Sequence, residues 1–147
     1  MNRTVKTLLQ LGLASVLLVP ALPAISQDKA TAPLLSVKQI MNAIITPMTS
    51  TIWGAYQLQT DAEWQAVENA ALTVMAAGNL LMAGGASADE QAQAREADWQ
   101  TYNAQMIAAA RQVLAAVASK DEDALSAAGN DALYPPCESC HQQYQSH

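Results

Sequence analysis

Two cysteines and a histidine lie within five consecutive residues near the end of this 147-residue chain. Cys137 and Cys140 are its only cysteines, and His141 follows them directly in the segment CESCH. C-x-x-C-H is the pattern for covalent attachment of a c-type haem. Two thiols one helical turn apart can each add to one vinyl group of a haem, and the adjacent imidazole can bind the iron. The segment therefore predicts one covalent haem c, with Cys137 and Cys140 as thioether anchors and His141 as iron ligand.

Other uses of these residues compete with haem attachment. A disulfide between cysteines three positions apart would close a tiny ring and constrain little of the unfolded chain. A zinc site needs four ligands, so Cys137, Cys140 and His141 would require His147 as the fourth. A thioredoxin-like C-x-x-C needs a β-α-β setting, and the sequence shows no strand pattern. The motif, together with the export signal described next, favours haem over these alternatives.

The N-terminus has the three parts of a secretory signal peptide. Arg3 and Lys6 form a short basic start, and the apolar run LLQLGLASVLLVPALPAIS then ends in a small-x-small cleavage site. We expect residues 1–26 to be cleaved, and residues 27–147 to form one domain in the periplasm without stable membrane insertion. A retained membrane anchor is the alternative, but two prolines interrupt the apolar run.

The mature chain is predicted to be acidic. Seven Lys and Arg residues, less the two in the signal peptide, leave 5 against 13 Asp and Glu, a net charge of −8. An acidic surface disfavours nucleic acids and anionic membranes as partners and favours basic ones. Outside the C-x-x-C-H segment the sequence shows no general base or nucleophile that would form a catalytic site, so we do not expect an enzyme.

Apolar residues recur at helical spacing along most of the chain, which predicts an all-α fold. Capping boxes begin two of the helices, at Thr60 with Glu63 and at Ser87 with Glu90, and Pro47 should bend the first helix. The expected helices span about Leu34 to Gln57, Thr60 to the Gly84–Gly85 pair, Ser87 to Ala118 as one long helix, and Asp121 to the interrupting Pro135 and Pro136, with CESCHQQYQ as a short terminal helix. Four such segments joined by short loops predict an antiparallel four-helix bundle.

An exported, alanine-rich, four-helix chain with one CESCH segment close to its C-terminus resembles the class II c-type cytochromes, the cytochrome c prime family. The segment SVKQIMNAIITPMTSTIWGAY is similar to the first helix of that family, which faces the distal side of the haem. The resemblance implies a haem among four helices, anchored by Cys137 and Cys140, with His141 as proximal ligand. It also implies a one-electron carrier with transient redox partner proteins, and homodimers are common in the family. The sequence departs from the family at YPP, before the motif, and in having no basic residue after it.

The group opposite His141 decides between two activities in this family. A methionine from the first helix makes a low-spin electron carrier, because Met/His ligation raises the reduction potential and closes the sixth position. An apolar residue there instead leaves five-coordinate iron that binds NO or CO. Met41 and Met48 lie seven residues apart on one apolar face, where methionines often only fill the core. We expect Met41 to be the ligand, since Met-ligated relatives carry theirs in this zone; Met48, or no protein ligand, is the alternative.

Four aromatic residues fall on the apolar stripes of the predicted helices. Trp53 and Tyr56 lie at the end of the first helix, and Trp99 and Tyr102 lie in the third. Two roles are open to them: they line the haem edge, or they fill the core as large aromatic residues in bundles usually do.

Overall fold

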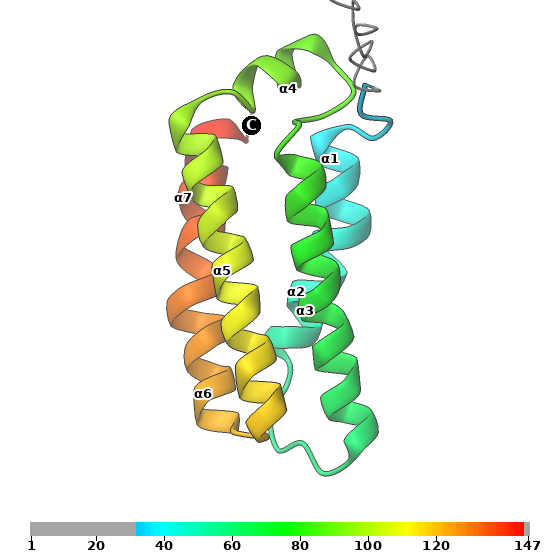
Figure 1. Cartoon of the computed structure of the whole chain (residues 1–147), viewed down its shortest axis with the longest axis vertical. Coiled ribbons are helices and arrows are strands. Elements are labelled where there is room, and N and C mark those ends of the chain that lie inside the picture. Colours follow the sequence, from blue (N-terminus) through cyan, green and yellow to red (C-terminus); the bar gives the residue numbers. More distant parts are fainter. Residues whose placement is uncertain (1–31, 146–147) are drawn as a thin grey trace, which may run out of the picture. The chain divides into compact units, whose positions relative to one another are not determined.

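The computed structural model describes residues 32–145, and within this range the chain forms helices joined by turns and short loops, without a β-strand (Figure 1). The all-α prediction is confirmed for these residues. No helix among them is both long enough and apolar enough to cross a membrane. The predicted signal peptide, residues 1–26, and His147 lie outside the described residues.

The helical elements follow one another closely along the chain. In order, they are α1 (Val37–Ile40), η1 (Met41–Ile45), α2 (Thr46–Trp53), α3 (Asp61–Leu81), α4 (Ala88–Gln93), α5 (Ala97–Ser119), α6 (Glu122–Ala127), η2 (Ala128–Leu133) and α7 (Tyr134–Tyr144). The two η elements are π-helical turns, in which an N–H group bonds to the carbonyl five residues back. Each continues directly into the next α-helix. The chain therefore has one helical segment from α1 to α2 and another from α6 to α7.

The π-helical segment η1 shows how the first helix accommodates its proline. The Thr46 N–H donates to the Met41 carbonyl, five residues back, just before Pro47. A proline ring crowds the carbonyl four residues back and offers that carbonyl no N–H. A wider turn at this point relieves the crowding, so the disturbance predicted at Pro47 takes the form of a π-helical turn and the helix continues to Trp53.

The prediction that Pro135 and Pro136 interrupt the last helix is wrong. A π-helical segment again allows the helix to continue past the prolines. Pro135 and Pro136 lie in the first turn of α7, where a missing N–H costs little. The preceding π-helical segment η2 leads into them, with the Tyr134 N–H bonded to the Gly129 carbonyl. That carbonyl also accepts a hydrogen bond of 2.9 Å from the Trp53 indole. The widened turn thus absorbs both prolines and is tied to the end of the first helical segment.

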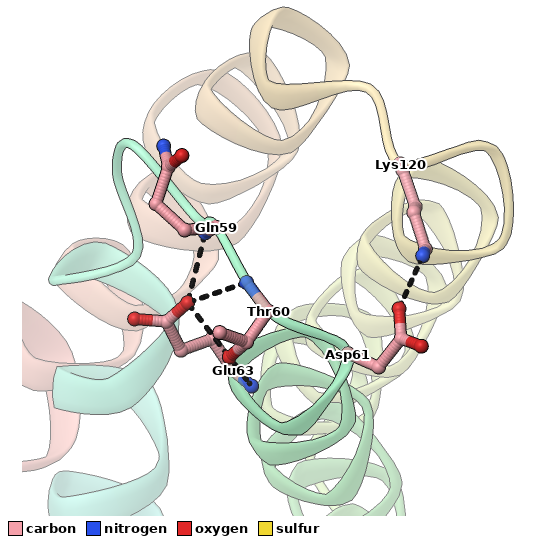
Figure 2. A network of polar contacts seen from close by, with 5 residues as sticks. All are labelled: Gln59, Thr60, Asp61, Glu63 and Lys120. Atoms are coloured by element: carbon pink, nitrogen blue, oxygen red, sulfur yellow. Dashed lines mark hydrogen bonds and ion pairs between the residues drawn. The ribbon is translucent and has the colours of Figure 1, made fainter.

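The start of α3 carries the predicted capping box, and both of its reciprocal bonds are present (Figure 2). The Thr60 hydroxyl accepts from the Glu63 N–H, and the Glu63 carboxylate accepts from the N–H groups of Gln59 and Thr60. These bonds, led by the one from Gln59, lower the pKa of Glu63. Beside them, an exposed ion pair joins Asp61 to Lys120, the left-handed residue that ends α5. The beginning of α3 and the end of α5 therefore meet at one end of the molecule.

The prediction of one long helix from Ser87 to Ala118 is wrong, because the chain forms two helices there, α4 and α5. The capping box of Ser87 and Glu90 begins α4 as predicted, but Glu96 takes an extended conformation (φ −70°, ψ 143°) and starts α5 anew. The Glu90 carboxylate also accepts a hydrogen bond of 2.8 Å from the Val37 N–H. This bond links α4 to the start of α1, and Ala94 is buried in the turn that follows α4. A single straight helix would not allow both contacts, since α4 crosses the end of the molecule (Figure 1).

Small residues bring the long helices close together. α3 lies beside α5 and α2, α5 lies beside η2 and α7, and consecutive long segments run in opposite directions (Figure 1). The buried face between α3 and α5 is rich in alanine, with Ala70, Ala71, Ala77, Ala109 and Ala110 each no more than 1% exposed. Gly78 lies in the same contact, where an added Cβ would come within 2.6 Å of Ile107 Cγ1. Close backbone approach, rather than large side chains, fills this part of the core.

Candidate haem-attachment site

Helix α7 carries all three residues of the C-x-x-C-H motif. An α-helix turns about 100° per residue, so Cys137, Cys140 and His141 fall on one side of α7, within about 100° of one another. Both thiols are free and half-buried, whereas His141 is exposed. A single turn of helix thus presents two sulfur atoms and one imidazole along one side.

The two thiols are held in their neutral form. Burial raises the pKa of Cys137 to about 11, and the neighbouring Cys140 adds to this rise. Burial also raises the pKa of Cys140. Catalytic C-x-x-C pairs have the opposite property, since a lowered pKa supplies their reactive thiolate. The burial that raises both pKa values therefore disfavours a thiol–disulfide exchange site.

The last turn of α7 is fastened to α5 by side chains that follow the motif. The Tyr144 ring meets the Trp99 indole edge-on, with centroids 5.0 Å apart and planes at 73°. The Trp99 indole N–H in turn donates to the Leu81 carbonyl at 2.8 Å. One turn along α5, the Tyr102 hydroxyl donates to the Gln143 side chain at 3.2 Å. The motif is therefore followed by contacts that connect α7 to both α5 and the end of α3.

The surroundings of this last turn are acidic. The Tyr144 hydroxyl donates to Glu96 at 2.9 Å, and the Gln143 amide donates to Asp98 at 3.3 Å. Partial burial, the hydrogen bond to Glu96 and the charges of Glu96 and Asp98 raise the pKa of Tyr144 to about 12. Carboxylates thus lie at the end of the helix that carries the motif.

The pairing of Trp99 with Tyr144 brings the start of α5 against the end of α7. Asn103 follows Trp99 by four residues, so it lies about 6 Å farther along α5 on nearly the same face. Both side chains donate to carbonyl groups at the end of α3, those of Leu81 and Gly78.

Asn103 holds a buried polar atom without a partner. The residue is 7% exposed, and its Nδ2 donates to the Gly78 carbonyl at 2.8 Å. That bond fixes the orientation of the amide, because the opposite orientation would set Oδ1 against another oxygen. Among the described residues, Oδ1 has no hydrogen-bond partner. Such an atom in a native protein calls for a bound group or water. The described residues thus leave one buried acceptor on α5 and two free thiols on the neighbouring α7.

Met41 and Met48 both lie on the first helical segment, which runs antiparallel to the last one (Figure 1). Trp53, which bonds to Gly129 and meets the Tyr134 ring at 6.3 Å, connects the end of the first segment to the last one. Met48 and Met41 lie five and twelve residues before Trp53, about 8 Å and 18 Å along the axis.

The same two methionines contribute to the packing of the protein. Both are half-buried and pack against the hydrophobic core. Met41 also opens η1, and π-helical turns of this kind are frequent at functional sites. The structure thus places both sequence-predicted candidates as half-buried residues of the first helical segment.

The predicted aromatic residues divide into two groups. Trp99 is buried and Tyr102 half-buried, both near the end of α7. Trp53 and Tyr56 are 42% and 73% exposed, so of the two roles left open, core filling is excluded for this pair. They belong instead to the surface beside the last helical segment.

The described residues show no clustered metal-binding group and two cavities away from the motif. Within residues 32–145, no three side chains of His, Cys, Asp or Glu gather as they would around a metal ion. A cavity of about 440 Å³ lies between α3 and α5, lined in part by Trp64 and Lys120. A second, of about 590 Å³, lies along α5, α6 and η2. Neither is lined by a motif residue.

Sequence reasoning missed two features of this site. The burial of Asn103 could not be recognised from the sequence, because asparagine is usually an exposed residue. The contact of Tyr144 with Trp99 was also missed. Its only signal in the sequence is that Tyr144 follows Cys140 by four residues and so lies on the same side of the helix.

No protein-family model, curated protein or solved structure matches this chain. Function is therefore inferred from the residues themselves, above all from the turn that carries Cys137, Cys140 and His141.

Proposed function

We propose that the chain is an exported monohaem c-type cytochrome of the class II type, which carries one electron at a time in the periplasm. The observation that carries the proposal is the single turn of α7 with two free, half-buried thiols and an imidazole on one side. The unpaired acceptor of Asn103 on α5, the helix that neighbours α7, supports a bound group between the helices.

The proposed architecture is an antiparallel four-helix bundle. Its four members would be the α1–α2 segment, α3, α5 and the α6–α7 segment, with α4 as a short crossing helix. The alternating directions of these segments and the contacts of α3 with α2 and α5, and of α5 with α7, support it. A bundle interior is a usual place for a cofactor held by side chains from facing helices.

Each protein group has a distinct role in this proposal. The thiols of Cys137 and Cys140 each add their sulfur and hydrogen across one vinyl group, which leaves two thioether bonds and no leaving group. His141 supplies an imidazole nitrogen to the iron. Haem iron, when bound, supplies the one-electron couple between its ferrous and ferric states. The long-range contacts of Tyr144 and Gln143 hold the turn that presents these residues.

Met41 is the proposed sixth ligand. Its half-buried position in the first helical segment and its place at the π-helical turn support this role, since such a turn can adjust without breaking the helix. A thioether ligand would close the iron to exogenous gases and raise the reduction potential. The acidic charge of the chain further suits a carrier that meets basic redox partners only transiently.

A second candidate function is binding of NO or CO at five-coordinate iron. The observation that favours it is the packing of Met41 and Met48 against the hydrophobic core, where a methionine needs no iron to be useful. In this version the iron has no sixth protein ligand.

The test is expression with export and haem maturation, followed by denaturing electrophoresis stained for haem and by absorption spectroscopy. We expect the mature protein to stay red after denaturation, with one haem per chain, and Cys137→Ser or Cys140→Ser to lose one of the two thioether bonds. A low-spin spectrum without CO binding supports the electron carrier. A high-spin spectrum with ready CO binding favours the gas-binding candidate, and a colourless mature protein contradicts both.

A further inference from the structure

Three exposed aromatic residues form a surface feature that the haem site does not use. Trp53, Tyr56 and Tyr134, here called the aromatic patch, are 42%, 73% and 51% exposed. The Trp53 and Tyr134 rings meet edge-on at 6.3 Å. Exposed tryptophan and tyrosine side chains are costly to leave in water and are the residues most enriched at the energetic centres of protein interfaces.

The patch is held in place by contacts to the last helical segment. The Trp53 indole N–H donates to the Gly129 carbonyl at 2.9 Å, and an added Cβ on Gly129 would lie 3.3 Å from the indole. Farther along the loop, the Gln57 N–H donates to Glu122 at 2.9 Å. Tyr56 lies between these two attachments and is therefore kept beside α6 and η2. A preformed aromatic surface loses little side-chain entropy on binding.

The patch continues toward the haem motif. Tyr134, Glu138 and His141 follow one another at spacings of four and three residues, so they share one stripe of α7. The Tyr134 hydroxyl donates to Glu138 at 3.3 Å, and His141 is exposed one turn farther. Tyr134 and His141 are about 10 Å apart along the axis. A molecule seated on the patch would therefore lie next to the turn that carries the motif.

The charge around the patch is mainly acidic, since Lys120, just before the last helical segment, is paired with Asp61. Residues 46–60, which include two of its members, have no charged side chain, and the chain has no Lys or Arg from residue 39 to 94. The last helical segment has no Lys or Arg, and its acidic residues are Glu122, Asp123, Asp131 and Glu138. Two copies of this surface would repel each other, whereas a basic surface would be attracted to it.

We propose that the aromatic patch and the acidic side chains beside it are the docking surface for a basic redox protein. The aromatic rings supply the contact area, and the acidic residues steer the partner and set its orientation. This inference rests on the proposed electron-carrier function and adds to it a surface and the charge of the partner.

The test uses the purified haem-containing chain and, as probe, a basic monohaem electron-transfer protein with an isoelectric point above about 9. Binding is followed by ¹⁵N NMR titration of the chain, and electron transfer from the ferrous chain to the ferric probe is followed by stopped flow. We expect Tyr56→Ser and Tyr134→Ser each to weaken binding at least about fivefold. Glu138→Gln and added salt should lower the association rate.

Matched control variants lie on α3, which neighbours α2 and α5. Leu72→Ser removes an apolar side chain that is 48% exposed, and Glu68→Gln removes one acidic charge. Both should leave binding of the probe unchanged. The proposal is overturned if the tyrosine variants bind the probe as well as the parent, or if the control variants weaken binding equally.

Two further readouts separate other outcomes. Sedimentation of the parent and of Tyr56→Ser tests a second copy as occupant, and a dimer that the substitution dissociates would overturn the basic partner. The haem spectrum of every sample reports on the proposed function independently. A normal spectrum with no effect of the patch substitutions would reject this inference alone, and a chain without haem would reject the proposed function.

Discussion

The Tyr144 ring stands edge-on against the Trp99 indole at 5.0 Å, and this contact joins the haem-motif helix to the beginning of α5. Trp99 also donates to the last residue of α3, Leu81. Three helices thus meet directly after the C-x-x-C-H turn. The position of His141 consequently depends on residues far from it in the sequence.

At alkaline pH the parent should lose stability as Tyr144 ionises, and Tyr144→Phe should abolish this loss. Burial and the carboxylates raise the pKa of Tyr144 to about 12 in the folded chain, against about 10 when unfolded. Because folding raises this pKa, the contribution of Tyr144 to the free energy of unfolding is fully present below about pH 10 and is lost as the pH rises through about 12. Urea denaturation between these values should show a steeper loss for the parent than for the variant. Equal slopes would mean that the Glu96 bond does not hold the phenol in its protonated form.

Glu90→Gln should weaken the link between α4 and α1. Burial opposes ionisation of Glu90, but hydrogen bonds from Ser87 and Val37 outweigh it and lower its pKa below 4.5. Stability from this group is therefore present above pH 4.5 and is lost as the pH falls through the lowered pKa. We expect a loss of about 1 kcal/mol in the free energy of unfolding at pH 7.

Glu63→Gln is the matched control for this substitution. Glu63 fills the same capping-box position on α3, but its bonds go only to neighbouring residues, Gln59 and Thr60. The difference between the two variants, measured by urea denaturation from pH 3 to 7, isolates the bond to Val37. If the two variants lose equal stability at every pH, the link from α4 to α1 contributes nothing.

In the proposed haem-containing protein, Met41→Ala should give a high-spin form that binds CO. Loss of a thioether ligand opens the sixth position and lowers the reduction potential. Met48→Ala removes a similar half-buried side chain and serves as the control, with a similar cost in stability of about 2 kcal/mol. Absorption spectra with and without CO decide the result. A spectral change in Met48→Ala alone would assign the ligand to that residue instead.

Gly78→Ala should destabilise the protein although alanine favours helix. The new methyl group would lie 2.6 Å from Ile107 Cγ1, and overpacking of this kind costs about 1–3 kcal/mol. Thermal unfolding measures the change. Ile107→Ala, introduced together with Gly78→Ala, should cost less than the sum of the two single substitutions, because it removes the clashing atoms. Strictly additive costs would show that the close approach of α3 and α5 is not the cause.

Local rules predicted the ends of several helices well. Thr60 with Glu63 and Ser87 with Glu90 form the predicted capping boxes, because these bonds involve only residues three positions apart. Gly84, expected to end the second helix, takes the positive φ of 82° that glycine allows. Each of these features depends on a few neighbouring residues, which the sequence displays directly.

Predictions failed where a distant partner decides the conformation. The break at Glu96 has no proline or glycine to mark it, and it lets α4 reach Val37 while Trp99 reaches Leu81. The continuous passage through Pro135 likewise depends on the wider turn of η2, whose Gly129 carbonyl is bonded to Trp53. These contacts join residues that are remote in the sequence, so local propensity carries no record of them.

Residue spacing was enough to predict that the described residues are mainly helical and that Cys137, Cys140 and His141 share one side of a helical turn, because helical period and spacing are local properties. The surroundings of that turn are visible only in the folded chain. There the Asn103 acceptor is buried without a partner among the described residues, Tyr144 packs against Trp99 at the end of α7, and Trp53 lies on the surface. Packing between helices depends on their register, which is established only when the chain folds.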